Sequence, residues 1–319
     1  MVTPLPELAL PDFFRVRQRF EGPLVEDVST SVRETLESLR LETRVRSGET
    51  VAVATGSRGI ANLTVVLAEI VRQLRSLGAE PFIVPAMGSH GGGTAEGQKR
   101  ILSSYGISDE SCGCPIRSSM EVVRVCDSKL GFPVLFDRNA FEADHVLVCN
   151  RVKPHTLYSG SIQSGLLKML LIGLGKRDGA ATYHRAILEH GFRAVLEDVG
   201  PNLLERCGVL AGVALVERGD DRTAWIEALP PERFFSDEPR LLEMATRWMP
   251  KLPFSEVDLL LIDEIGKNLS GSGLDVNVVG RKSSLHHASA DQPIRIRFIA
   301  VRSLTPETLG NAVGIGAAE

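Results

Sequence analysis

Four short segments of the sequence combine glycine or small polar residues with a cation or an imidazole, and each follows an apolar run typical of a strand. They read TGSRG, GSHGGG, NRVKPHT and DEIGKN, and they contain Arg58, His90, His155 and Lys267. Glycine lets the backbone approach a ligand and leaves N–H groups open to an anion, while arginine offers a planar fork that matches a carboxylate or a phosphate. We therefore expect an anion-binding rim that takes a phosphorylated cofactor or an acid substrate.

These glycine segments do not match the common nucleotide motifs. Neither TGSRG nor GSHGGG has the spacing of the dinucleotide fingerprint or of the phosphate loop with its paired lysine and serine. A nicotinamide cofactor is therefore not supported by motif. A nicotinamide-dependent oxidoreductase stays an alternative, because many such enzymes share the strand-helix-strand pattern and the fold does not dictate the function.

The elements that must position these segments alternate between strands and helices. Residues 50–55 predict a buried strand, residues 63–77 a helix that ends at Gly78, residues 80–86 a second strand, and a second helix is expected to begin near Thr94. Parallel strands joined in this way hold their ligands at the carboxyl ends. The loops with Arg58 and His90, 32 residues apart, should therefore share one rim.

Further strands are expected at 144–150, 207–218, 256–263 and 294–304, and a segment rich in proline and charge precedes the last two. The predicted fold is α/β with two domains. Residues 1–235 form an N-terminal Rossmann-like parallel sheet flanked by helices, 236–256 a linker, and 257–319 a smaller α/β C-terminal domain. The active site is expected in the cleft between the domains.

Composition excludes several classes of protein. Lys plus Arg number 36 against 40 Asp plus Glu, a net charge of −4 without a basic stripe, which disfavours nucleic acid as a partner. No apolar run is long enough to span a membrane, and the N-terminus lacks the basic and apolar regions of a secretory signal. The five cysteines are scattered, as expected of reduced thiols. We expect a cytoplasmic protein.

The segment from Asn150 to His184 resembles the nickel-dependent lactate racemase family. In that family a lysine carries a nickel-pincer nucleotide (a pyridinium-3-thioamide-5-thiocarboxylic acid mononucleotide) through a thioamide bond, and a histidine sixteen residues later binds the nickel. Lys168 and His184 have this separation. The resemblance implies that Lys168 holds the cofactor covalently and that His184 is the metal ligand.

Four further positions follow from the same resemblance. His90 and His155 match the two histidines that act as acid and base, while Arg58 and Lys267 match the residues that hold the substrate carboxylate. Glu264 stands where lactate racemases commonly have glutamine, so we expect it to contact the substrate and to alter substrate choice. The family also implies cofactor-biosynthesis proteins as partners and favours a homodimer. Its members usually continue for about a hundred residues beyond the last matching motif, so the C-terminal domain is expected to be short.

The implied reaction is the interconversion of stereoisomers of a 2-hydroxy acid. Removing the α-hydrogen as a proton would add negative charge beside a carboxylate. Removing it as hydride gives a flat keto acid, and returning hydride to one face or the other gives the two configurations. Histidine changes charge near neutral pH, so two histidines on opposite sides can exchange roles as acid and base. A neutral imidazole also suits nickel, and apolar neighbours of Lys168 penalise its ammonium form.

Each of these residues also has an ordinary explanation. A single histidine after a strand is usually a surface residue, Lys168 could cover apolar neighbours with its stem, and Lys267 could pair with an acidic neighbour. A protein that keeps the nickel cofactor without catalysis is therefore a second alternative. Lys153 and Lys176 lie in the same glycine-rich region, but we leave them outside the predicted site.

Overall fold

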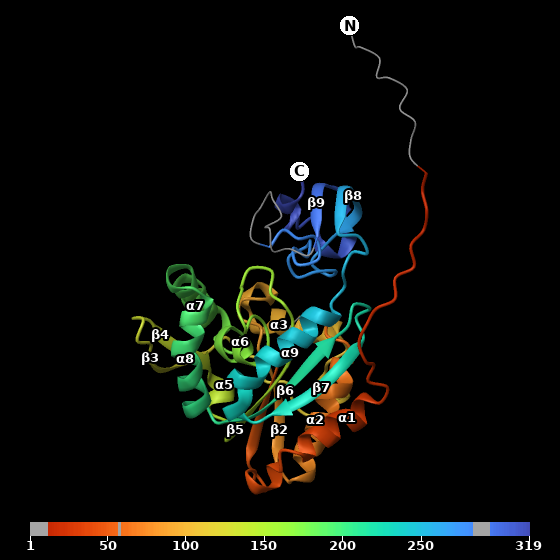
Figure 1. Cartoon of the computed structure of the whole chain (residues 1–319). Helices are drawn as coiled ribbons and strands as arrows, with labels where there is room; N and C mark the ends of the chain where they lie inside the picture. The colour runs from red at the N-terminus through yellow and green to blue at the C-terminus, as the bar shows by residue number, and fades with distance from the viewer. Residues whose placement is uncertain (1–11, 57–58, 283–293) are drawn as a thin grey trace.

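The computed structural model describes residues 12–56, 59–282 and 294–319, and the predicted substrate ligand Arg58 lies outside these residues (Figure 1). The strands are β1 (Thr50–Thr55), β2 (Glu80–Pro85), β3 (Val122–Asp127), β4 (Pro133–Asp137), β5 (His145–Arg151), β6 (Val209–Glu217), β7 (Thr223–Leu229), β8 (Glu256–Ile265) and β9 (Arg295–Leu304). The α-helices are α1 (Val28–Glu37), α2 (Leu63–Ser76), α3 (Ala95–Ser104), α4 (Asp109–Cys112), α5 (Arg138–Phe141), α6 (Leu166–Lys168), α7 (Lys176–His190), α8 (Phe192–Arg206) and α9 (Phe234–Trp248). A π-helical turn, η3 (Met169–Gly173), follows α6, and short 3-10 turns include η2 (Gly91–Gly93).

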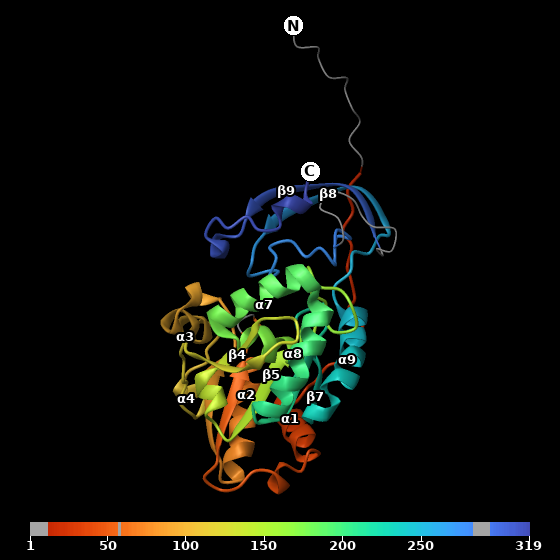
Figure 2. The same cartoon turned by 90° about the vertical axis from the view of Figure 1, so that its left-hand side faces the viewer.

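The larger part of the molecule is a five-stranded sheet in the order β2-β1-β5-β6-β7, with β7 antiparallel to β6 and the other pairs parallel. Its central strands are nearly continuous runs of buried apolar residues, as parallel strands covered on both faces require. Helices α1 and α2 pack with one buried cluster, and α7, α8 and α9 pack with the other (Figure 2). The predicted α/β class with a parallel sheet flanked by helices is confirmed.

The local sequence explains the helix boundaries beside the predicted loops. Helix α2 buries a stripe of apolar side chains at helical spacing, including Leu63, Leu67 and Leu74. Its chain then turns at Gly78, whose φ of +81° is a left-handed conformation that suits glycine. Thr94 caps α3 by accepting a hydrogen bond from the backbone N–H of Gly97 at 3.1 Å, so the predicted start of this helix is confirmed.

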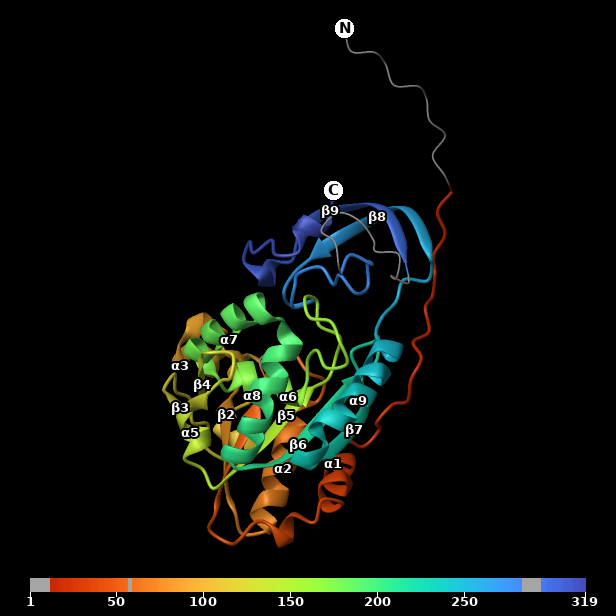
Figure 3. The same ribbon diagram turned by 60° about the vertical axis from the view of Figure 1, so that its left-hand side comes forward.

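The C-terminal part is built on β8 and β9, which pair in parallel and carry a small apolar cluster of their own. In the cartoon it lies beyond the end of the larger sheet (Figure 3). Its sheet leaves Leu259, Leu261 and Phe298 exposed. Within the range predicted as a linker, α9 continues to Trp248 and contributes Leu241 to the core of the larger part. The domain limits stay a prediction.

No helix in the part of the chain that the structure describes has both the length and the apolar character needed to cross a membrane.

Candidate functional site

The loop after β2 presents His90 at the carboxyl edge of the sheet. The three glycines that follow it, Gly91, Gly92 and Gly93, have φ values of +65°, +70° and +64°. Residues with a side chain rarely adopt this left-handed conformation, so the GGG run is needed for the shape of the loop. His90 itself is exposed, and the backbone N–H of Gly88 donates to the carbonyl oxygen of Gly173 at 3.0 Å. The loop is thereby joined to the segment that carries Lys168.

Lys168 lies close enough to His184 to affect its charge, because the helix is interrupted between them. Sixteen residues of continuous α-helix would separate them by about 24 Å. Instead, α6 ends at Lys168, η3 widens the helix, and α7 begins only at Lys176. Single π-helical turns often mark functional sites. A side chain at Gly173 would come within 2.7 Å of the carbonyl oxygen of Ala86, so this turn also requires a glycine.

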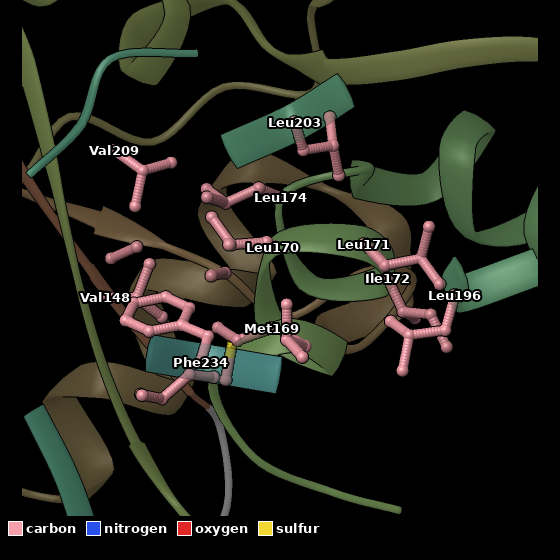
Figure 4. Close-up of a cluster of buried hydrophobic side chains, with 14 of the residues drawn as sticks. Val148, Met169, Leu170, Leu171, Ile172, Leu174, Leu196, Leu203, Val209 and Phe234 are labelled. Carbon is pink, nitrogen blue, oxygen red and sulfur yellow. The ribbon is translucent and has the colours of Figure 1, made fainter. Parts of the chain in front are cut away.

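The core holds the interrupted helix in place. Leu166 and Leu167 precede Lys168 and are fully buried. The apolar residues that follow lie within the same cluster (Figure 4), namely Met169, Leu170, Leu171, Ile172 and Leu174. Lys168 is half-buried. The apolar neighbours predicted to surround Lys168 therefore anchor the turn in the core.

Tyr158 is the residue around which the predicted site residues gather. Its buried ring stacks on His155 with ring centres 4.2 Å apart. Its hydroxyl oxygen lies 3.1 Å from Nδ1 of His184, and Nζ of Lys168 lies 5.4 Å from the centre of its ring. Three predicted site residues, from the loop after β5, from α6 and from α7, thus surround one tyrosine. The sequence did not single out Tyr158, because one aromatic residue in a Gly/Ser-rich segment carries no recognisable pattern.

The ring of His155 is held by its own loop. Its Nδ1 accepts hydrogen bonds from the backbone N–H groups of Leu157 and Tyr158, both at 3.1 Å. Because both partners are donors, Nδ1 carries no proton in this arrangement, and the proton of the neutral ring resides on Nε2. His155 therefore presents an N–H at its other ring nitrogen.

His184 has the properties of a nitrogen ligand. The residue is exposed, yet partial desolvation of its ring and the nearby ammonium of Lys168 lower its pKa below 6.5. The neutral form is therefore favoured at neutral pH. Only a neutral imidazole has a lone pair to give to a metal or to a proton.

Lys176 is fully buried, unlike a typical lysine in a glycine-rich segment. Its Nζ donates to the carbonyl oxygen of Pro85 at 2.7 Å and to Oε1 of Gln98 at 2.9 Å, and it lies 3.4 Å from Oδ2 of the buried Asp137. Burial lowers the pKa of Lys176 and raises that of Asp137.

Gln98, which accepts a hydrogen bond from Lys176, connects this buried lysine to the His90 loop. Nε2 of Gln98 donates to the carbonyl oxygens of Gly88 and His90. Lys176 thus supports the His90 loop from within the core.

Glu238 of α9 supports the start of α6. The carboxylate is completely buried, and its Oε2 accepts a hydrogen bond from the backbone N–H of Leu167 at 3.1 Å. Among the described residues, its Oε1 has no hydrogen-bond partner. Burial raises the pKa of Glu238 to about 7, against a smaller opposing effect of the backbone N–H groups of Leu167 and Leu166. This carboxylate could not be recognised from its sequence pattern, since it lies in an ordinary amphipathic helix.

Replacing Glu238 with glutamine should stabilise the protein at pH 8. Because the folded-state pKa lies above the unfolded value of 4.5, the wild type loses stability as the pH rises from 4.5 through about 7. Glutamine keeps an oxygen for Leu167 but cannot ionise. Ionisation costs the wild type about 3 kcal/mol at pH 8, and the unpaired amide donors of glutamine cost about 1–2 kcal/mol at every pH, so we expect a net gain of about 1–2 kcal/mol at pH 8 and a net loss of about 1–2 kcal/mol at pH 4.5. Urea unfolding at both pH values measures it.

The exposed Glu243 on the same helix offers the control, because Glu243→Gln should leave the pH dependence of unfolding unchanged. A gain for Glu238→Gln that is equal at both pH values would show that ionisation is not its cause.

The C-terminal part touches the His155 loop. Oε1 of Gln163 accepts both the backbone N–H of His155 at 2.9 Å and Nζ of Lys282 at 2.8 Å. Nζ of Lys153 lies 3.8 Å from Oδ2 of Asp275. Residues distant in sequence therefore meet beside a predicted acid/base residue.

The two predicted site residues of the C-terminal part lie at the end of β8. Glu264 is exposed on the strand, and Lys267 is exposed in the turn that follows, where its backbone N–H donates to Oγ1 of Thr308 at 3.4 Å. Their contact with a substrate stays a prediction, as does that of Arg58.

The comparison with protein families decides the relationship. Residues 14–194 match the model of the lactate racemase N-terminal domain, a span that contains His90, His155, Lys168 and His184. The chain belongs to the lactate racemase family. This match covers more than half of the chain, so the resemblance inferred from the sequence is confirmed.

Among solved structures, this family member is similar to the lactate racemase apoprotein from Thermoanaerobacterium thermosaccharolyticum. The TM-score is 0.53 at 15% sequence identity, and the likeness covers 78% of this chain and 63% of that chain. At this identity the likeness shows a shared fold. The chain spans less than two thirds of the length of that relative. No match was found among curated proteins.

Proposed function

We propose that this family member is an isomerase that interconverts the stereoisomers of a 2-hydroxy acid with the help of a nickel-pincer nucleotide. The observation that supports it most is the convergence of Lys168, His184 and His155 around Tyr158. A primary amine, a neutral imidazole and a second imidazole thereby lie in one place. The membership in the lactate racemase family supports the same reaction class.

The residues present fit such a cofactor. Lys168 ends a helix that is anchored in the core, which leaves its amine beside His184 for covalent attachment. The lowered pKa of His184 keeps a nitrogen lone pair available for nickel at neutral pH. When bound, the cofactor supplies an acceptor that takes hydride from carbon and returns it. The glycine-rich His90 loop, which contacts the turn at Gly173, would line the same site.

The two histidines would exchange the hydroxyl proton of the substrate. With Nδ1 held by two backbone N–H groups, a neutral His155 donates a hydrogen bond through Nε2. To accept the proton, the ring of His155 must turn away from these N–H groups, so a rotation of this side chain would accompany proton transfer. Arg58 and Lys267 would hold the carboxylate, and Glu264 would accept a hydrogen bond from a donor on the substrate. Assembly as a dimer and supply of the cofactor by biosynthesis proteins are part of the same proposal.

A test uses protein loaded with nickel-pincer nucleotide and single enantiomers of several 2-hydroxy acids in deuterated buffer. We expect the opposite enantiomer to form from at least one acid, with the original α-hydrogen retained, because hydride does not exchange with water. Chiral chromatography with mass spectrometry measures both quantities. Protein without cofactor is the control.

Deuterium at the α-carbon of the product would indicate proton abstraction and would contradict the hydride mechanism. Loaded protein that interconverts none of the acids would favour a cofactor-binding protein without catalysis. A requirement for a nicotinamide cofactor would favour the oxidoreductase alternative.

A further inference from the structure

The ring of Tyr158 lies between two other rings. His155 stacks on it at 4.2 Å with planes 11° apart, and Phe192 of α8 stacks on it at 4.3 Å with planes 2° apart. Parallel stacking at these distances fixes the position and the tilt of the middle ring. Tyr158 is 9% exposed, so the stack is part of the folded core. The hydroxyl group is therefore presented from a rigid support.

This hydroxyl group reaches the ring of His184 on α7. The distance from Oη to Nδ1 is 3.1 Å, within the range of a hydrogen bond. Since Nδ1 is engaged in this way, only Nε2 is left for a metal or a substrate. Histidines that bind metals usually have their second nitrogen fixed by such a partner, which sets the direction of the ring and its basicity.

The same tyrosine also constrains His155. Besides the stacking contact, the backbone N–H of Tyr158 donates to Nδ1 of His155. One residue therefore contacts the proposed acid/base and the proposed nickel ligand, through different atoms. The aromatic contact and the backbone N–H act on His155, whereas the hydroxyl group acts on His184.

We propose that Tyr158 is a positioning residue that aims Nε2 of His184 at the nickel and fixes it relative to His155. The metal part of this inference rests on the proposed function, while the link between Tyr158 and His184 does not. With nickel on Nε2, the proton of the neutral His184 ring is on Nδ1 and is donated to Oη of Tyr158.

The test compares Tyr158→Phe, which removes only the hydroxyl group, with Tyr158→Leu, which also removes the stack. In metal-free protein with ¹⁵N-labelled histidine, Tyr158→Phe should move the Nδ1 resonance of His184, assigned by its absence in His184→Asn. The resonance of the backbone N–H of Leu157 should be unchanged in Tyr158→Phe and should shift in Tyr158→Leu. Tyr105→Phe, at an exposed tyrosine, should change neither signal.

In protein loaded with the nickel-pincer nucleotide, Tyr158→Phe should release nickel to a chelator about 10- to 100-fold faster than the wild type. Melting temperatures check that both variants are folded. An unchanged His184 resonance in Tyr158→Phe would overturn the positioning role. A moved resonance with unchanged nickel release would overturn the role in metal binding. If neither the wild type nor any variant takes up nickel with the cofactor, the proposed function fails. The Nδ1 resonance of His184 then decides by itself whether Tyr158 positions His184.

Discussion

Replacing Lys168 with alanine is expected to abolish covalent attachment of the cofactor and to lower isomerase activity at least ~10³-fold. Lysine is needed because its uncharged amine can act as a nucleophile, so Lys168→Arg, which keeps a positive charge, should fail equally. The side chain is half-buried at the end of α6, and its loss should leave the buried neighbours in place. Intact-mass measurement of loaded protein, followed by peptide mapping, locates the adduct.

Lys153 provides the matched control for this experiment. It lies in the same glycine-rich segment, but it is close to Asp275 rather than to Tyr158. Lys153→Met should therefore keep the adduct on Lys168. An adduct that persists in Lys168→Ala, or that maps to Lys153, would contradict the role that the family resemblance assigns to Lys168.

Replacing Lys176 with methionine is expected to destabilise the protein by about 3–5 kcal/mol. The change leaves Asp137 buried without its ion-pair partner, and it removes the donor that serves Pro85 and Gln98. Methionine is unbranched at Cβ like lysine, so the left-handed backbone at this position, with φ of +54°, should add little to the difference. Urea unfolding at pH 7 measures the loss.

Two further variants distinguish the mechanism. Arg177→Met removes the neighbouring cation, whose ion pair with Asp178 is largely exposed, and should cost less than about 1 kcal/mol. The double variant Lys176→Met with Asp137→Asn should recover part of the loss, because no unpaired charge stays buried. Equal losses for Lys176→Met and Arg177→Met would show that the buried pair does not control stability. Hydrogen exchange of residues 88–93 should also quicken in Lys176→Met, since Gln98 loses a partner.

Much of the fold follows from the sequence, because its parallel strands are continuous apolar runs. The strands at 50–55, 80–85 and 145–151 and the cap at Thr94 all lie close to their predicted positions. Strand β7 and the β3–β4 hairpin were not foreseen, since their burial is mixed and gives a weaker pattern. The α/β class therefore depended on the signals that are strongest in a buried sheet.

The candidate site was only partly foreseeable. The resemblance to the lactate racemase family paired Lys168 with His184, but periodicity cannot reveal the π-helical turn that interrupts the helix between them. Lys176 and Glu238 were missed as supports, because lysine and glutamate are usually solvated and only the folded chain shows which are buried. Tyr158 was missed because its importance arises from three neighbours that are distant or follow no regular spacing.

Oε1 of Gln163 accepts two hydrogen bonds, and this limits how the His155 loop could be grafted onto another protein. It accepts the backbone N–H of His155 from its own loop and the ammonium of Lys282, 119 residues further along the chain. A copy of the loop grafted onto another scaffold would keep the first donor and lose the second. The conformation of residues 155–163 is therefore encoded jointly by two remote stretches of sequence, and a graft must carry both to reproduce it.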